Sequence, residues 1–136
     1  KKIEDYSDII EECYAGLGET YKKAGNDQAA KAVYYEMIEK YRESKTTRGY
    51  YLSRAWYHLG LIEMDSGNYS AAISNFQQAE EAAKGRIITT DQKLELWMQA
   101  SECCKKLNDL DKAMSLLSKV INEDAVSGLR LKAMYL

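Results

Sequence analysis

The residues that could do chemistry in this chain are one histidine, three cysteines and a few glycines. His58 has no serine or cysteine at a spacing typical of a nucleophile and its base. One histidine and the adjacent pair Cys103 and Cys104 do not give the ligand spacing of a zinc site. The glycines between residues 16 and 25 lack the lysine and the serine or threonine of a phosphate-binding loop. The sequence therefore predicts no catalytic, metal-binding or cofactor-binding residues, and a protein that is not an enzyme.

Charge and hydropathy argue against two further classes of partner. Nineteen basic and 21 acidic residues give a formal net charge of −2. The basic pairs, at 22–23 and 105–106, lie among glutamates instead of forming the basic stripe of a nucleic-acid-binding protein. No apolar run approaches the ~18 residues that a membrane-spanning helix needs. We therefore expect neither a nucleic-acid partner nor a membrane-spanning segment.

The elements that carry these residues are expected to be helices. The chain contains no proline, whereas average usage would place roughly seven in a chain of this length. Proline breaks the interior of a helix, so its absence favours a structure that is nearly all helix.

Three segments share one pattern of small and large residues. From a small residue it is seven positions to a turn residue, five more to an alanine and four more to a large residue. The copies are Gly18, Gly25, Ala30, Tyr34; then Gly60, Gly67, Ala72, Phe76; and then Ser101, Asn108, Ala113, Leu117. The small residue lets a second helix approach closely, and glycine or asparagine adopts the left-handed conformation that ends a helix. Each copy therefore predicts a helix–turn–helix hairpin whose large residue fills the core.

The pattern resembles the tetratricopeptide repeat, in which a large residue, a Leu-Gly pair and a later series of glycine, alanine and aromatic positions recur in a frame of about 34 residues. Matching frames lie at residues 11–44, 53–86 and 94–127. The resemblance implies an all-α fold, a right-handed superhelical solenoid of antiparallel helix pairs, over a single domain at 1–136.

The copies are spaced more widely than that frame. The interval is 42 residues from Gly18 to Gly60 and 41 from Gly60 to Ser101. The additional residues include serine, threonine and aspartate, which are helix N-cap types, so we expect a lengthened first helix in each repeat. The expected helices span 3–24, 27–42, 48–66, 69–84, 91–106 and 110–122. A last amphipathic run over 125–136 resembles the first helix of a fourth repeat, which gives about seven helices and implies a fragment of a longer chain.

In this family the first helix of each repeat lines a concave face, so the resemblance implies a groove that holds a peptide or helix of a partner protein. Transferring the groove positions onto this sequence selects Arg54, Tyr57, His58, Leu61, Met64, Met98 and Glu102. An open alternative is that Leu61, Met64 and Met98 pack against an adjacent helix. The lysine, asparagine and arginine of the family's chaperone-tail clamp are replaced by Ala15, Glu19, His58, Glu95 and Gln99. A chaperone-tail adaptor is therefore not expected.

Two other functions stay open at this point. The C-terminal run offers Leu129, Ala133 and Leu136 for self-association, which would make the protein a homo-oligomer. The chain could also be a regulatory domain of a larger protein. The segments 34–44 and 55–60 are similar in style to bacterial cell-envelope tetratricopeptide proteins, which implies the bacterial periplasm or cell envelope, with the cytoplasm as the alternative.

Overall fold

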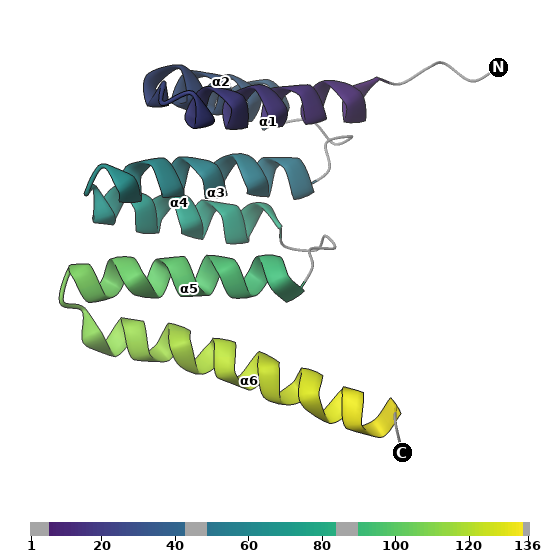
Figure 1. Ribbon diagram of the computed structural model, residues 1–136, viewed down its shortest axis with the longest axis vertical. Helices are drawn as coiled ribbons and strands as arrows, with labels where there is room; N and C mark the ends of the chain where they lie inside the picture. The colour runs from purple at the N-terminus through teal and green to yellow at the C-terminus, as the bar shows by residue number, and fades with distance from the viewer. Residues whose placement is uncertain (1–5, 43–48, 84–89, 135–136) are drawn as a thin grey trace. The chain divides into compact units, whose positions relative to one another are not determined.

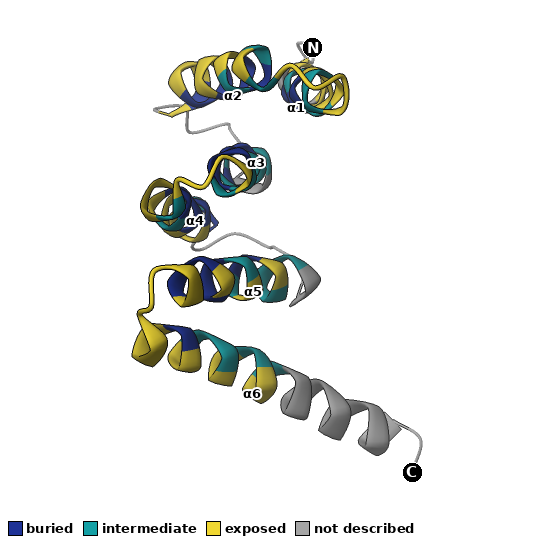
Figure 2. Cartoon of the chain, turned by 60° about the vertical axis from the view of Figure 1, so that its left-hand side comes forward, coloured by how far each residue is buried: buried dark blue, intermediate teal, exposed yellow. Residues whose placement is uncertain are grey.

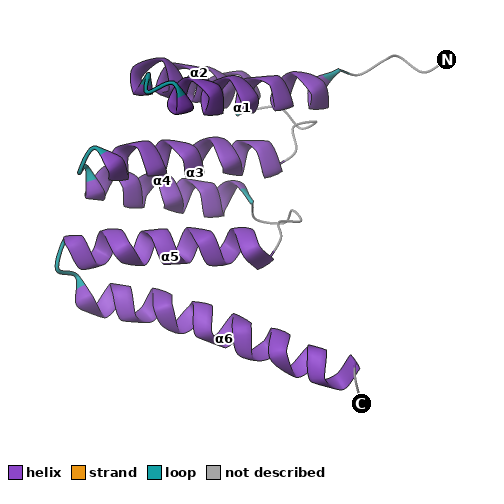
Figure 3. Ribbon diagram, in the orientation of Figure 1, coloured by secondary structure: helices purple, strands orange, loops and turns teal. Residues whose placement is uncertain are grey.

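The structure is a computed structural model that describes residues 6–42, 49–83 and 90–134. Within these ranges the side chains of residues 7, 8, 49, 50, 90, 91 and 124–134 are not described. All regular structure in the described ranges is α-helical (Figure 1; Figure 3). The helices are α1 (Ser7–Lys23), α2 (Asp27–Tyr41), α3 (Gly49–Asp65), α4 (Tyr69–Ala82), α5 (Thr90–Lys106) and α6 (Leu110–Met134).

These elements confirm the predicted all-α class of adjacent helix pairs, with six helices in the described residues instead of about seven. The difference lies in α6, which continues through the run expected to be a separate helix and ends at Met134. In the described residues, a positive φ occurs only at Gly25, Gly67 and Asn108. No such residue stands between 122 and 125 to end the helix, so α6 runs on.

The three turns inside the hairpins have the same backbone geometry. Gly25, Gly67 and Asn108 adopt φ values of 81°, 82° and 62°, as the repeat pattern predicted. In each turn the next residue donates its amide to a carbonyl five residues back, for example Asn26 to Tyr21 at 2.9 Å. The left-handed residue itself donates to a carbonyl three residues back. This is the Schellman motif, which satisfies carbonyl groups that would be left unpaired at a helix end.

The first two hairpins close in the same way, with an aromatic ring laid over a glycine. A Cβ atom added to Gly18 would lie 2.5 Å from Cζ of Tyr34, and one added to Gly60 would lie 2.5 Å from Cε1 of Phe76. Both rings are almost fully buried. The small residue of the repeat is therefore what allows the two helices of each hairpin to approach, as expected.

The chain divides into two compact units, residues 1–87 and 88–136, and each is described by itself. In the first unit α1 packs on α2, α3 packs on α4, and α3 also contacts α2 and α1. Its core includes Tyr34, Met37, Ile38, Leu59 and Ile62. In the second unit α5 packs on α6, and the buried side chains there are Leu96, Ala100, Ser101, Cys103, Cys104 and Ala113. Figure 2 shows the buried and exposed sides of each helix.

Candidate functional site

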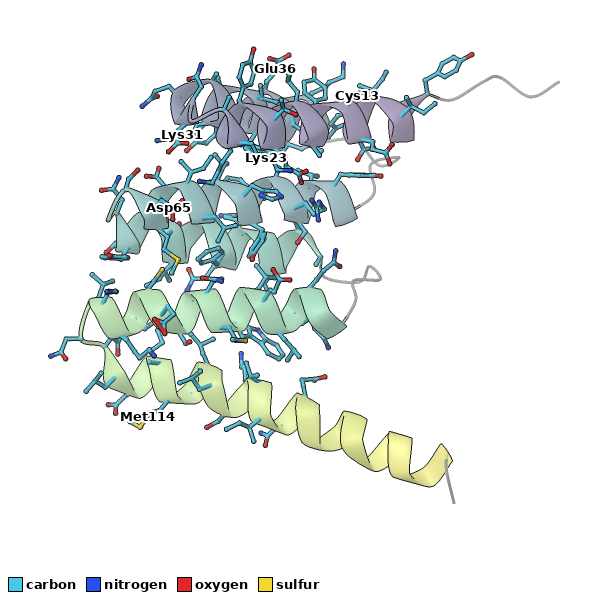
Figure 4. The ribbon with its side chains drawn as sticks, viewed as in Figure 1. Cys13, Lys23, Lys31, Glu36, Asp65 and Met114 are labelled. Atoms are coloured by element: carbon cyan, nitrogen blue, oxygen red, sulfur yellow. The ribbon has the colours of Figure 1, made fainter. Side chains whose placement is uncertain are left out.

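Polar contacts between side chains join helices α1 and α3. Helical spacing of three or four residues puts these side chains on one face of each helix. The contacts are Tyr51 to Glu12 at 3.4 Å, Arg54 to Glu19, and Lys22 to Asp65 at 2.7 Å. Asp65 is labelled in Figure 4. Two of these three contacts, Arg54 with Glu19 and Lys22 with Asp65, join groups of opposite charge and so balance one another.

His58 lies at the centre of these contacts. Its Nε2 is 3.3 Å from Nη2 of Arg54 and 3.2 Å from Oε2 of Glu19. In one tautomer it accepts from Arg54, and in the other it donates to Glu19. Its side chain is 16% exposed. Burial and the neighbouring Arg54 guanidinium lower the pKa of His58 from its ordinary value of 6.5, so the ring is neutral at pH 7.

The ring of Tyr34 reaches this cluster from α2. It is stacked on His58 with ring centroids 5.3 Å apart and planes only 7° from parallel. Its hydroxyl is buried and finds no hydrogen-bond partner among the described residues. Burial, reinforced by the charge of Glu19, raises the pKa of Tyr34 well above its ordinary value of 10.0. The first hairpin thus contributes both the carboxylate and an aromatic wall to the surroundings of His58.

Glu63, near the end of α3, is buried. Its Oε2 lies 3.4 Å from Nζ of Lys31 on α2, and its Oε1 accepts from Nδ2 of Asn68 at 2.9 Å. Lys31 is labelled in Figure 4. The carboxylate therefore links two hairpins and braces the turn after α3. The sequence alone did not indicate these partners of Glu63.

The five groove residues predicted on α3 are all half-buried. Arg54 and His58 belong to the cluster with Glu19, and Tyr57 contacts the ring of Phe76 with centroids 5.7 Å apart. Leu61 and Met64 follow on the same face toward the end of α3. The structure thus brings two predicted groove residues of α3 together with Glu19 of α1, a residue that the repeat frame also places toward the groove. The role of Tyr34 beside them was missed, because the repeat pattern marks it only as a core residue.

The remaining predicted residues lie on the second unit. Met98 is half-exposed to solvent at 50%, and Glu102 pairs with Lys105 at 2.6 Å on the surface of α5. Leu129 and Ala133 lie within α6, but their side chains are outside the description, and Leu136 lies outside the described residues. Self-association through these three residues stays a prediction.

Other chemistry finds no support among the described residues. No group of three histidine, cysteine, aspartate or glutamate side chains there could hold a metal ion. Burial raises the pKa of Cys103 to about 11 and also raises that of Cys104, so neither is a reactive thiolate at neutral pH. In the same part of the chain, no helix combines the length and apolar character needed to cross a bilayer.

Comparisons with known proteins agree with the repeat geometry. Two family models, both described as tetratricopeptide repeat, match the sequence. One matches residues 63–135, which is more than half of the chain, and the other matches residues 14–44. A search of curated proteins gives no match.

Proposed function

The chain belongs to the tetratricopeptide repeat family, and on this premise we propose that the α1–α3 face binds a peptide or helix of a partner protein. Repeats of this family generally mediate protein–protein interaction, and the family is typically a non-enzymatic scaffold. The proposal concerns where binding occurs and which side chains carry it.

The proposal rests on the partial exposure of the apolar side chains of Leu61 and Met64. Both remain half-buried on a face of α3 that also carries Arg54, His58 and Asp65. A half-buried apolar side chain beside satisfied polar groups can be covered by a partner at little desolvation cost, because the polar groups keep their existing bonds. Interface anchors are commonly apolar side chains surrounded by such polar contacts.

The polar pairs around these anchors indicate the chemistry of the partner. Glu19 pairs with Arg54, and Lys22 pairs with Asp65, so the face offers no strong excess of either charge. We therefore expect a peptide selected mainly by one or two apolar side chains, with polar contacts fixing its orientation. Met98 and Glu102 lie on α5 in the second unit, and their part in binding stays a separate prediction.

The test begins by selecting peptides against the whole chain by display, followed by calorimetric titration of a selected peptide. Replacing Leu61 and Met64 together with alanine is expected to weaken binding by about tenfold or more, because buried anchors dominate interface energies. The matched control is Tyr35→Ala, which removes an exposed side chain from α2. Helicity, measured by circular dichroism, is expected to be unchanged in both variants. Unaltered affinity in the double variant, or an equal loss in the control, would contradict the proposal.

A further inference from the structure

The outer face of α1 is an exposed surface without charge. Its members are uncharged and lie on the side of the helix opposite the buried residues; they are the N-cap residue Tyr6 and the helical residues Ile9, Ile10, Cys13, Gly16, Leu17 and Thr20. In Figure 2 the exposed residues of α1 lie on the side away from α2. Among the described side chains of α1, Glu12 and Lys23 are the only exposed charged ones, and both lie at the edge of this outer face. Soluble helices usually place charges on such a face, so its composition requires an explanation.

Even the polar group of Thr20 is satisfied within the helix. Its hydroxyl donates to the carbonyl of Gly16 at 2.7 Å, which leaves its methyl group for packing. Ile9 is 59% exposed and Leu17 is 47% exposed. Burying these side chains against a second apolar surface would be favourable and would leave no hydrogen bond unmade.

Gly16 gives an independent indication that something packs here. A Cβ atom added to Gly16 would meet nothing within 4 Å, unlike one added to Gly18. A glycine inside a helix is unfavourable relative to alanine, and the packing of this chain does not require one at position 16. A glycine on an exposed helix face does, however, allow a second helix to approach closely from outside.

The outer face is complementary to itself. Counted from Cys13, Ile10 and Gly16 lie three residues to either side, Ile9 and Leu17 lie four, and Tyr6 and Thr20 lie seven. These intervals keep all the residues on one helix face. In an antiparallel pair of α1 helices centred on Cys13, Ile10 would stand opposite Gly16, Tyr6 opposite Thr20, and Ile9 opposite Leu17. A parallel pair would set glycine against glycine and leave a gap.

We propose that the outer face of α1 binds a second copy of this chain, in an antiparallel helix pair with its two-fold axis near Cys13. A two-fold interface requires one patch that is complementary to itself, and the outer face of α1 meets this requirement through large–small pairing and the absence of charge. A single helix face is smaller than a standard interface, so the dimer dissociates on dilution. The outer face borders the proposed peptide-binding face at Glu12, which contacts Tyr51 of α3.

The first test is sedimentation equilibrium of the whole chain between about 1 µM and about 1 mM, a range that spans weak affinities. We expect a monomer–dimer equilibrium that Leu17→Asp weakens at least tenfold. The matched control is Ile121→Asp, because Ile121 is 66% exposed on α6; it should leave the equilibrium unchanged. A monomer at every concentration overturns the proposal, as does a dimer that Ile121→Asp disrupts and Leu17→Asp does not.

A second variant separates the interface from helix stability. Gly16→Ala should raise the thermal unfolding temperature under dilute, monomeric conditions, because alanine favours helix and meets no neighbour in the monomer. The same substitution should raise the dimer dissociation constant severalfold, because the added methyl group stands where Ile10 of the second copy packs. A stabilised monomer with unchanged dimer affinity would overturn the proposed close contact.

Chemical cross-linking locates the contact directly. Cys13 (labelled in Figure 4) is exposed, whereas Cys103 and Cys104 are buried. A short bifunctional maleimide applied to the native protein should therefore join two chains through Cys13, and Cys13→Ser should abolish the product. Leu17→Asp should reduce it in proportion to the loss of dimer. Equal cross-linking in the Leu17→Asp variant would contradict the interface.

Discussion

The hairpins α1–α2 and α3–α4 are built on the same interval between a glycine and an aromatic ring, yet their outer surroundings differ. In the first, Tyr34 covers Gly18; in the second, Phe76 covers Gly60. Helix α1 exposes a charge-free face to solvent, whereas none of the described residues of α3 before Asp65 is fully exposed. The repeat pattern thus fixes the inside of each hairpin, and the neighbours of the hairpin decide what its other residues do.

Tyr34 and Phe76 occupy equivalent positions in the two hairpins, but only Tyr34 carries a hydroxyl group. Phe76 has no polar atom to satisfy, while the Tyr34 hydroxyl is buried beside His58 without a described partner. The first hairpin therefore carries a polar atom into the contact with α3, where Glu19 and Arg54 also meet. The equivalent residue of the second hairpin contributes only packing.

The largest loss of unfolding free energy should come from disrupting the contact between a glycine and an aromatic ring that both hairpins share. Gly18→Ala and Gly60→Ala each force a Cβ atom against a buried ring, and overpacking of this kind costs about 1–3 kcal/mol of unfolding free energy. Urea denaturation followed by circular dichroism measures the change. The control is Gly16→Ala, which should stabilise by up to about 1 kcal/mol, because position 16 has no such neighbour. Equal effects at positions 16 and 18 would contradict the ring-over-glycine account.

A smaller change in unfolding free energy, of opposite sign, should follow when Tyr34 of the first hairpin is replaced by phenylalanine, the residue at the equivalent position of the second. Tyr34→Phe removes a buried hydroxyl that has no described partner, so unfolding free energy should stay the same or rise by about 1 kcal/mol. A hydroxyl that made a good hydrogen bond would instead cost about 1 kcal/mol on removal. A loss of that size in urea denaturation would show that Tyr34 has a polar partner.

The smallest expected effect concerns pH at the contact between the two hairpins. Because the folded state lowers the pKa of His58 below 6.5, the unfolded chain takes up a proton more readily than the folded one. The corresponding stability is present above pH 6.5 and is lost as the pH falls below it. Between pH 7.5 and pH 5.5 the wild type should therefore lose more unfolding free energy than His58→Gln. Parallel pH profiles would exclude His58 as the source.

Much of the fold follows from the sequence, because its signals are local. The left-handed turn residues and the glycines under the rings stand at fixed intervals, and the absence of proline lets the helices between them form. The expected helix 69–84 ends at Ala82 in the structure, and 110–122 extends to Met134. Helix ends are harder to predict where no glycine or asparagine marks them.

The candidate site was predicted less completely, because its contacts join residues far apart in the sequence. The repeat frame identified Arg54 and His58, since their positions on α3 are set by local spacing. It did not predict that Glu19 pairs with Arg54 or that Tyr34 stacks on His58. Those contacts depend on how one hairpin packs against the next. No short-range spacing in the sequence indicates that packing.

The most direct test of the proposed binding face uses the methionines as reporters. Spectra of the whole chain with ¹³C-labelled methionine methyl groups would be recorded during titration with a selected peptide. Met64 is half-buried on α3, Met37 is fully buried in the core, and Met114 is exposed on α6. We predict that the Met64 resonance shifts with peptide concentration, while those of Met37 and Met114 stay in place. A shift of Met114 with an unchanged Met64 would contradict binding at the α1–α3 face.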